Sequence, residues 1–325
     1  MKNEIFENRI DLSRVREKSA LIKSCVAHHI VGQDKIIDLL LIALFSDGHV
    51  LLEGVPGVAK TLTSKILAKA VQATFRRVQF TPDLMPSDIT GTSVFNIKSN
   101  EFEFRKGPLF GNIILADEIN RSPAKTQAAL FEAMEERQIT VDGSTHLLEP
   151  PFMVVATQNP IEQEGTYRLP EAQLDRFLFK LKVDYPSQED EVKILKNFHE
   201  RKNVMDLSNV EPVLSAHELI MIREAVFSLG VEDNLLAYIS KIVNETRNNP
   251  ALFLGASPRA SISILNTAKA TAALHGRDFV TPDDIKFVAP HVLNHRVILT
   301  PDKEMEGKTT LSVIDTILQN VEVPR

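Results

Sequence analysis

The sequence contains one cysteine, no tryptophan and no long apolar run. A single cysteine cannot form an intramolecular disulfide, so Cys25 is expected to pack as a small apolar side chain. No stretch approaches the roughly 18 uninterrupted apolar residues of a membrane span, and the first residues mix charges without an apolar segment. We therefore expect a cytoplasmic protein. The absence of tryptophan excludes no class of function.

An excess of positive charge is also missing. The 325 residues include 37 Lys and Arg against 43 Asp and Glu, a formal net charge of −6, and no basic run stands out. Because proteins that bind a duplex normally present a basic face, this balance argues against DNA or RNA as the principal partner. The length, with 43% hydrophobic residues, is sufficient for two domains and a large core.

A glycine-containing turn lies between an apolar run and a helix-like stretch. It reads Gly54, Val55, Pro56, Gly57, Val58, Ala59, Lys60, Thr61 and Leu62. A strand that leads into such a turn, followed by the N-terminus of a helix, is typical of a phosphate-binding loop. We predict that these residues bind a nucleotide, with Lys60 at the outer phosphates and the Thr61 hydroxyl on Mg²⁺. The alternative is an ordinary tight turn with an exposed lysine.

The loop departs from the usual pattern at its last glycine, where this chain has Ala59. A methyl group is tolerated there if residue 59 has a helical φ angle. A loop of this kind requires positive φ angles, and we therefore expect them at Gly54 and Gly57.

Polar residues follow two further apolar runs. The first run, 112–116, ends in Asp117 and Glu118, and is typical of a central parallel strand. Since ligands of open α/β sheets bind at the carboxyl ends of strands, we predict that Asp117 serves Mg²⁺ and that Glu118 orients and polarises an attacking water. The second run, 152–157, leads to Asn159, which is expected at the γ-phosphate or that water. Taken alone, the two acids also fit a solvated turn, and Asn-Pro is a turn former.

Four more segments make a family resemblance specific. They are residues 80–91, 106–110, 116–121 and 169–177. With the phosphate loop, they resemble the MoxR family of AAA+ ATPases over nearly the whole chain. The resemblance implies a ring-forming ATPase, expected as a hexamer, that uses ATP and Mg²⁺ to remodel protein partners, most often ones with a von Willebrand factor A-type domain. Arg168 stands where the family commonly has proline.

The order of the patterns predicts two domains. Strand and helix patterns alternate in the first part, and helix patterns dominate after an apolar strand that ends near residue 183. Because Ser187 is a plausible N-cap, we place an α/β nucleotide-binding domain at 1–185 and an α-helical lid at 186–325. The expected fold is a P-loop AAA+ core with a parallel sheet and inserted β-hairpins, followed by an all-α lid.

Two hairpins are expected inside the core. Residues 93–97 and 101–105 alternate around a short turn, and 138–141 lead to Asp142-Gly143, a strong turn signal. Without the family resemblance, the simplest interpretation is that they are edge hairpins that only widen the sheet. By resemblance to the branch that includes magnesium-chelatase motors, they face the ring pore or the partner.

The resemblance also assigns roles outside the loop. Arg176 resembles the arginine finger that reaches a neighbouring subunit, and Arg259 resembles the sensor that couples the lid to the γ-phosphate. A salt bridge to Asp175 and a solvated side chain are their respective alternatives. Val31 and Gly32 are expected to contact adenine. His291 and His295 have a possible metal spacing on one helix face, but no third ligand accompanies them and we interpret them as structural.

These assignments predict in-line attack of water on ATP bound between subunits. Three alternatives stay open. A magnesium-chelatase-like motor subunit would share every ATP residue and differ in its partner. A nucleic-acid-dependent AAA+ motor would be stimulated by DNA at low salt. A nucleotide-gated binding module would bind ATP without turnover, and the presence of Glu118 argues against it.

Overall fold

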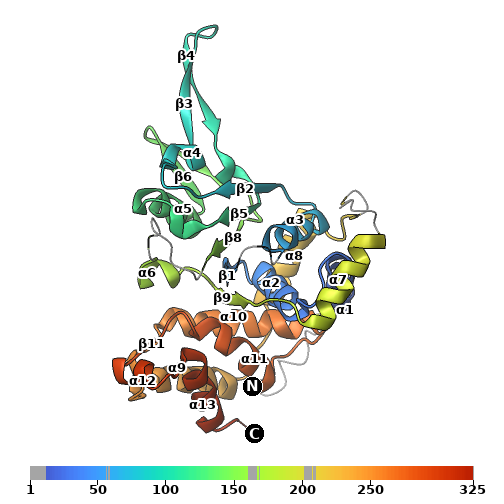
Figure 1. The fold of residues 1–325 in the computed structure, drawn as a ribbon, viewed down its shortest axis with the longest axis vertical. Helices are drawn as coiled ribbons and strands as arrows, with labels where there is room; N and C mark the ends of the chain where they lie inside the picture. Colours follow the sequence, from blue (N-terminus) through green and yellow to red (C-terminus); the bar gives the residue numbers. More distant parts are fainter. Residues whose placement is uncertain are drawn as a thin grey trace.

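The computed structural model describes residues 12–324 except 56, 58, 160–166, 168, 201–206 and 208–209. Its centre is a five-stranded parallel sheet with the strand order β2-β5-β8-β1-β9 (Figure 1). The strands are β1 (Val50–Gly54), β2 (Phe75–Gln79), β5 (Ile113–Asp117), β8 (Met153–Gln158) and β9 (Phe179–Val183).

The two central strands β5 and β8 are apolar because both of their faces are covered. Successive side chains of a strand point to opposite faces. Ile113 and Met153 belong to one buried cluster, whereas Ile114 and Val154 belong to a second one. The predicted continuous apolar strands are therefore confirmed.

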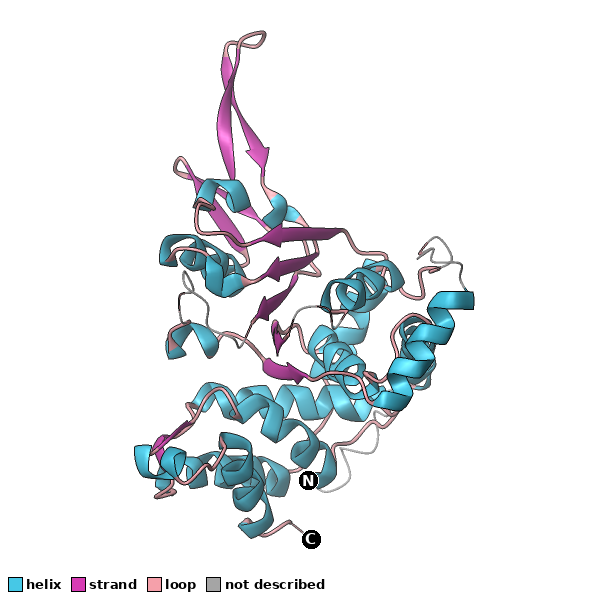
Figure 2. Ribbon diagram, in the orientation of Figure 1, coloured by secondary structure: helices cyan, strands magenta, loops and turns pink. Residues whose placement is uncertain are grey.

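Helices cover both faces of this sheet (Figure 2). The first face packs against α2 (Asp34–Phe45) and α3 (Lys60–Ala70), and α1 (Ser13–Ala27) packs against both of these helices. Cys25 packs against the same apolar cluster. The second face packs against α5 (Ala124–Glu136), which buries Leu130, Phe131 and Met134, with α4 (Pro86–Thr90) beside it. Three short helices, η2 (Pro108–Phe110), η3 (Ile119–Arg121) and α6 (Glu171–Leu174), lie in the connections.

Both predicted hairpins are present. The first pairs β3 (Gly91–Asn96) with β4 (Glu101–Lys106) and extends away from the body of the molecule (Figure 1). The second pairs β6 (Gln138–Val141) with β7 (Ser144–Leu147) through Asp142 and Gly143, which have φ angles of 50° and 78°. The rings of Phe104 and His146 stack with centroids 4.2 Å apart, so the hairpins contact each other.

The rest of the chain is mainly helical. Its helices are α7 (Gln188–Glu200), α8 (Ala216–Phe227), α9 (Asp233–Asn248), α10 (Pro258–Leu274), α11 (Pro282–Leu293), α12 (Pro301–Met305) and α13 (Thr310–Asn320). A two-stranded sheet of β10 (Leu252–Leu254) and β11 (Ile298–Leu299) interrupts them, which the expectation of an all-α lid omitted. Helix α10 packs against α2, so one apolar cluster continues from the α/β core into these helices. Among the described helices, none combines the length and apolarity needed to cross a membrane.

Candidate active site

The predicted phosphate loop connects β1 to α3. Pro56 and Val58 lie outside the described residues. Gly57 has a φ angle of 90°, as expected. The expected helical φ angle at Ala59 is wrong, because this residue has φ 56° and ψ 17°, in the left-handed region. The expected positive φ angle at Gly54 is also wrong, because Gly54 is not among the residues with positive φ. Gly54 is required for a different reason: a Cβ atom there would lie 2.5 Å from the carbonyl oxygen of Val183 in the neighbouring strand β9.

Lys60 is the first residue of α3, and its side chain folds back over the loop. Its Nζ atom donates a hydrogen bond of 2.6 Å to the carbonyl oxygen of Gly54. Burial lowers the pKa of Lys60, while the charges of Asp117 and Glu118 oppose this effect. The ammonium group is therefore within electrostatic reach of both predicted acids. Thr61 follows in the first turn, and Leu62 and Val55 pack partly against the core.

Asp117 is the last residue of β5, and two groups from neighbouring strands bind its carboxylate. Its Oδ1 atom accepts a hydrogen bond of 2.6 Å from the Thr157 hydroxyl at the end of β8. Its Oδ2 atom lies 2.7 Å from Nη2 of Arg77 in β2. Sequence reasoning missed both partners. The only signal for Thr157 was its position at the end of the apolar run 152–157, and nothing in the sequence marked Arg77, the middle residue of β2.

Glu118 has a left-handed backbone, with φ 56° and ψ 49°. Its N–H group donates to the Thr157 hydroxyl at 2.8 Å, so Thr157 orients both acids. Its Oε2 atom accepts hydrogen bonds from Nε2 of Gln79, at 3.0 Å, and from Nη1 of Arg121, at 2.8 Å. A non-glycine residue in this region is uncommon and tends to mark functional sites.

The oxygen atoms of Thr61 and Asp117 suit a hard cation. Mg²⁺ prefers oxygen ligands, keeps several waters and is commonly bound through one or two protein groups plus substrate phosphates. Within the described residues, no group of three or more His, Cys, Asp or Glu side chains forms an all-protein metal site. The residues present therefore fit a magnesium ion that is shared with a nucleotide.

Three other residues predicted to contact the nucleotide lie at the same edge of the sheet or close to α7. Asn159 directly follows β8 and is partly buried. Val31 and Gly32 precede α2, and Gly32 has a φ angle of 77°. A Cβ atom at Gly32 would lie 2.7 Å from Oδ2 of Asp190 in α7, so the chain passes close to that helix. No described contact tests the predicted adenine site.

Arg176 and Arg259 lie at the opposite edge of the sheet. The N–H group of Leu178, two residues after Arg176, donates to the carbonyl oxygen of His49, which immediately precedes β1. The His49 ring in turn contacts the carbonyl oxygen of Met134 near the end of α5. This is the amino-terminal edge of the sheet, whereas the phosphate loop and Asp117 lie at the carboxyl ends of the strands.

One carboxylate brings these two arginines together. Glu135 in α5 lies 2.5 Å from Nη2 of Arg259 and 3.7 Å from Nε of Arg176. The salt bridge considered between Arg176 and Asp175 is absent from the described contacts, since Asp175 pairs instead with Arg296, at 2.6 Å. The Arg259 side chain is 54% exposed, so solvent also reaches it.

Comparisons with known proteins establish the family and support the fold. Residues 49–179 match the family model described as the ATPase family associated with various cellular activities, and residues 244–317 match the AAA lid domain. Chaperone MoxR1 of Mycobacterium tuberculosis is 45% identical over 305 residues, which cover 91% of this chain and 80% of that protein. Protein MoxR of Methylorubrum extorquens is 30% identical, with 95% and 96% covered. The chain belongs to the MoxR family of AAA+ ATPases.

Two further relatives are similar over almost their full length. The protein YeaC of Bacillus subtilis is 50% identical over 294 residues, which cover 90% of this chain and 91% of that protein. A crystal structure from Cytophaga hutchinsonii, described as a candidate ATPase, has 42% sequence identity to this MoxR-family chain and a TM-score of 0.85. The match covers 97% of this chain and 99% of the chain in that crystal structure.

The two histidines considered as metal ligands do not share a helix face in this MoxR-family structure. Helix α11 ends at Leu293, so His295 lies beyond it and that part of the expectation is wrong. The Nε2 atom of His295 contacts the carbonyl oxygen of Phe177 at 2.9 Å. Burial lowers the pKa of His295 well below its ordinary value and that of His291 to about 4.

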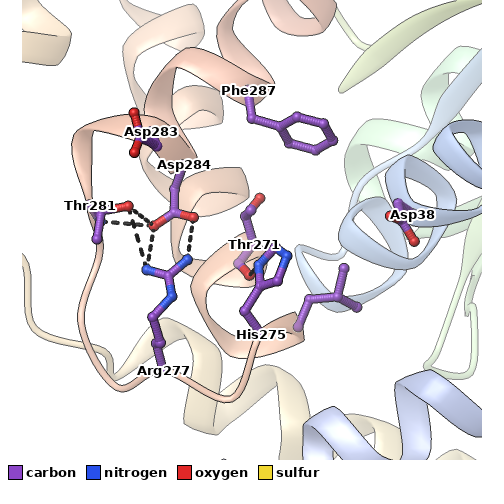
Figure 3. Close-up of a pocket in the computed structure, with 9 residues that line it drawn as sticks. Asp38, Thr271, His275, Arg277, Thr281, Asp283, Asp284 and Phe287 are labelled. Carbon is purple, nitrogen blue, oxygen red and sulfur yellow. Dashed lines mark hydrogen bonds and ion pairs between the residues drawn. The ribbon is translucent and has the colours of Figure 1, made fainter.

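A cavity of about 570 Å³ lies between α2, α10 and α11 (Figure 3). Its lining comprises Asp38, Thr271, Leu274, His275, Arg277, Thr281, Asp283, Asp284 and Phe287. Arg277 donates to both carboxylate oxygens of Asp284, at 2.6 and 2.8 Å, and Asp284 also completes the capping box of α11 with Thr281. These bonds fix the turn between α10 and α11, and no phosphate-loop residue lines the cavity.

Proposed function

We propose that this protein hydrolyses ATP and uses the reaction to remodel a protein partner in the manner of a chaperone. The observation that carries the proposal is the convergence of Lys60, Asp117 and Glu118 at one edge of the parallel sheet. Crevices at the carboxyl ends of such strands are where α/β folds bind ligands. The 45% identity to a protein named as a chaperone supports the second half of the proposal.

The residues at the carboxyl edge of the sheet would have separate roles in ATP hydrolysis. The N–H groups at the start of α3 and the Lys60 ammonium would bind the phosphates, replacing the bond from Lys60 to Gly54. Thr61 and Asp117 would hold Mg²⁺, which neutralises charge on the β- and γ-phosphates when bound. Glu118 would orient the attacking water. Because Gln79 and Arg121 already bind one of its oxygens, the other has a defined direction.

The position of Arg176 and Arg259 supports a proposed active site shared between two subunits. Arg176 and Arg259 lie at the amino-terminal edge of the sheet, away from the phosphate loop of their own chain. We place them against the γ-phosphate of a neighbouring subunit in a ring, which we propose to be a hexamer. An arginine supplied in this way contributes roughly three to five powers of ten to the rate, because charge develops on the peripheral phosphate oxygens.

The hairpin of β3 and β4 is the proposed contact with the partner. It projects from the body, and Phe95, Ile97 and Phe102 are 46%, 87% and 74% exposed. Exposed apolar side chains gathered on one projection are typical of interaction surfaces. Following the family resemblance, we propose a partner with a von Willebrand factor A-type domain.

Two substitutions test the division of roles. Lys60→Ala should abolish ATP binding, because it removes the cation at the phosphates. Glu118→Gln should bind ATP as the natural protein does and lose at least about a hundredfold in kcat, because its role lies in the transition state. Calorimetric ATP titration and phosphate release measure the two effects. An equal loss of ATP affinity in both variants contradicts the assignment.

The same Glu118→Gln variant can be used to find the partner, since it should stay in the ATP-bound state. Binding of a von Willebrand A-type domain should be tighter with ATP than with ADP. Identical affinities in the two nucleotide states refute this part of the proposal. Stimulation of ATP turnover by DNA at low salt would instead support the nucleic-acid motor.

A further inference from the structure

Arg296 lies just beyond α11, and only 8% of it is exposed. Its Nε atom donates to Oδ1 of Asp175 at 2.6 Å, and its Nη2 atom donates to the carbonyl oxygens of Asp175 and Phe177 at 3.0 and 2.8 Å. Its Nη1 atom donates to the carbonyl oxygens of Leu178 and Val292 at 3.2 and 2.6 Å. One guanidinium group therefore binds the chain on both sides of residue 176.

Neighbouring residues strengthen this attachment. The His295 ring contacts the carbonyl oxygen of Phe177 at 2.9 Å, and Nδ2 of Asn294 donates to the carbonyl oxygen of Lys180 at 3.0 Å. The Ser257 hydroxyl, two residues before Arg259, donates to Oδ2 of Asp175 at 3.4 Å. Two parts of the helical region thus hold the same short segment of the α/β core.

The segment has little regular structure of its own. Helix α6 ends at Leu174 and β9 begins at Phe179, and local backbone hydrogen bonds, such as that from Arg176 N–H to the carbonyl oxygen of Gln173 at 3.2 Å, continue the turn only briefly. The contacts from the helical region add a second attachment to these residues. A planar guanidinium with five donors can bind several carbonyl oxygens and a carboxylate at once, and a lysine ammonium cannot reproduce that geometry. At the surface of this segment, Arg176 and Arg259 meet at Glu135.

We propose that Arg296 is a positioning residue for Arg176. It fixes residues 175–178 to the helical lid, so that Arg176 and Arg259 approach the γ-phosphate of the neighbouring subunit together. The proposal rests on the proposed function, in which Arg176 acts on the neighbour's nucleotide. It adds that the position of the lid in one subunit controls hydrolysis in the next.

Arg296→Lys is the primary test, because it keeps the positive charge and removes the planar set of donors. ATP affinity should stay within about twofold of the natural protein, since the phosphate loop is unchanged. We expect kcat to fall about tenfold to a hundredfold, the range for a catalytic group displaced by about 1 Å. Arg277→Lys is the matched control, since Arg277 binds Asp284 in a comparable way and touches no residue of 175–178. Its kcat should match that of the natural protein.

Mixed assemblies separate positioning from a general structural effect. Lys60→Ala subunits cannot hold ATP but carry an intact segment 175–178, so adding them to Arg296→Lys subunits should restore turnover. A local structural defect would impair the variant's own ATP site, and no added subunit would repair it. The reference mixture is Arg176→Ala with Lys60→Ala.

Asp175→Asn is the second variant, for use if Arg296→Lys does not fold. It should show a smaller loss of kcat, the same unchanged ATP affinity and the same rescue. An undiminished kcat in a folded variant overturns the proposal. So does a lack of rescue when the reference mixture is rescued. If the reference mixture also fails, the shared site itself is wrong, and the role of Arg296 is refuted with it.

Discussion

At the scale of single residues, Ala59 has a backbone conformation that favours glycine. Its φ angle of 56° lies in the left-handed region, where a Cβ atom costs roughly 1–2 kcal/mol. The sequence pattern could not show this, because the pattern identifies the loop but leaves its φ angles undetermined. The alanine therefore stores strain directly before Lys60, the residue expected to bind phosphate.

Replacing Ala59 by glycine should stabilise the nucleotide-free protein. The relief of strain exceeds the added entropy of the unfolded chain, so we expect the free energy of unfolding to rise by about 0.5–1 kcal/mol. The matched control is Ala128→Gly, at an exposed position within α5, which should lower it by about 1 kcal/mol. Urea denaturation measures both. A loss of stability of similar size in both variants would show that Ala59 is unstrained.

The sequence predicted Lys60, Asp117 and Glu118 as site residues because their residue types and order are characteristic, and the structure places them near one another. Sequence reasoning did not identify Thr157 or Gln79, which bind the two acids from neighbouring strands. A hydrogen bond between residues about 40 positions apart depends on strand order. A single sequence does not reveal that order.

At the scale of helices and strands, local signals predicted local structure well. Asp142-Gly143 gave a tight hairpin because both residues accept positive φ angles. The helix face expected to carry both His291 and His295 was wrong, because α11 ends at Leu293 and no glycine follows that residue in the sequence to mark the end.

Two buried histidines, His49 and His295, and the partly buried His291 should make stability depend on pH. Burial lowers the pKa of His291 to about 4, with a further contribution from the Lys35 charge, and it also lowers the pKa values of His49 and His295. Because the unfolded chain binds these protons at a higher pH, around 6.5, stability is complete above that pH. It falls as the pH decreases toward 4, by about 1.4 kcal/mol per pH unit for each histidine.

His291→Gln should remove one of these contributions. The free energy of unfolding, measured with urea at about pH 7.5, 6 and 5, should then fall less steeply than in the natural protein, by about 1.4 kcal/mol per unit below pH 6.5. His217→Gln, at an exposed position in α8, should leave the slope unchanged. Identical slopes for the natural protein and His291→Gln would contradict the assignment of a lowered pKa to His291.

At the scale of the whole molecule, the residues that we propose for ATP hydrolysis lie at two opposite edges of the sheet. Lys60, Asp117 and Glu118 lie at the carboxyl ends of the strands, and Arg176 lies with Arg259 at the other edge. The sequence supplied the family and the fold, but the spacing between Arg176 and Lys60 does not reveal which edge each occupies. That separation is why the proposed active site needs a second subunit.

The most direct test of this account is ATP turnover in a mixture of Arg176→Ala and Lys60→Ala subunits. Arg176→Ala should bind ATP nearly normally and hydrolyse it poorly, and Lys60→Ala should not bind it. In mixed rings, Lys60→Ala subunits offer an intact Arg176 to loaded neighbours, so turnover should exceed the sum of the separate variants. The specific activity of the natural protein should also rise with its concentration as rings form. No gain in a mixture shown to co-assemble, together with activity that does not depend on concentration, would contradict the shared site.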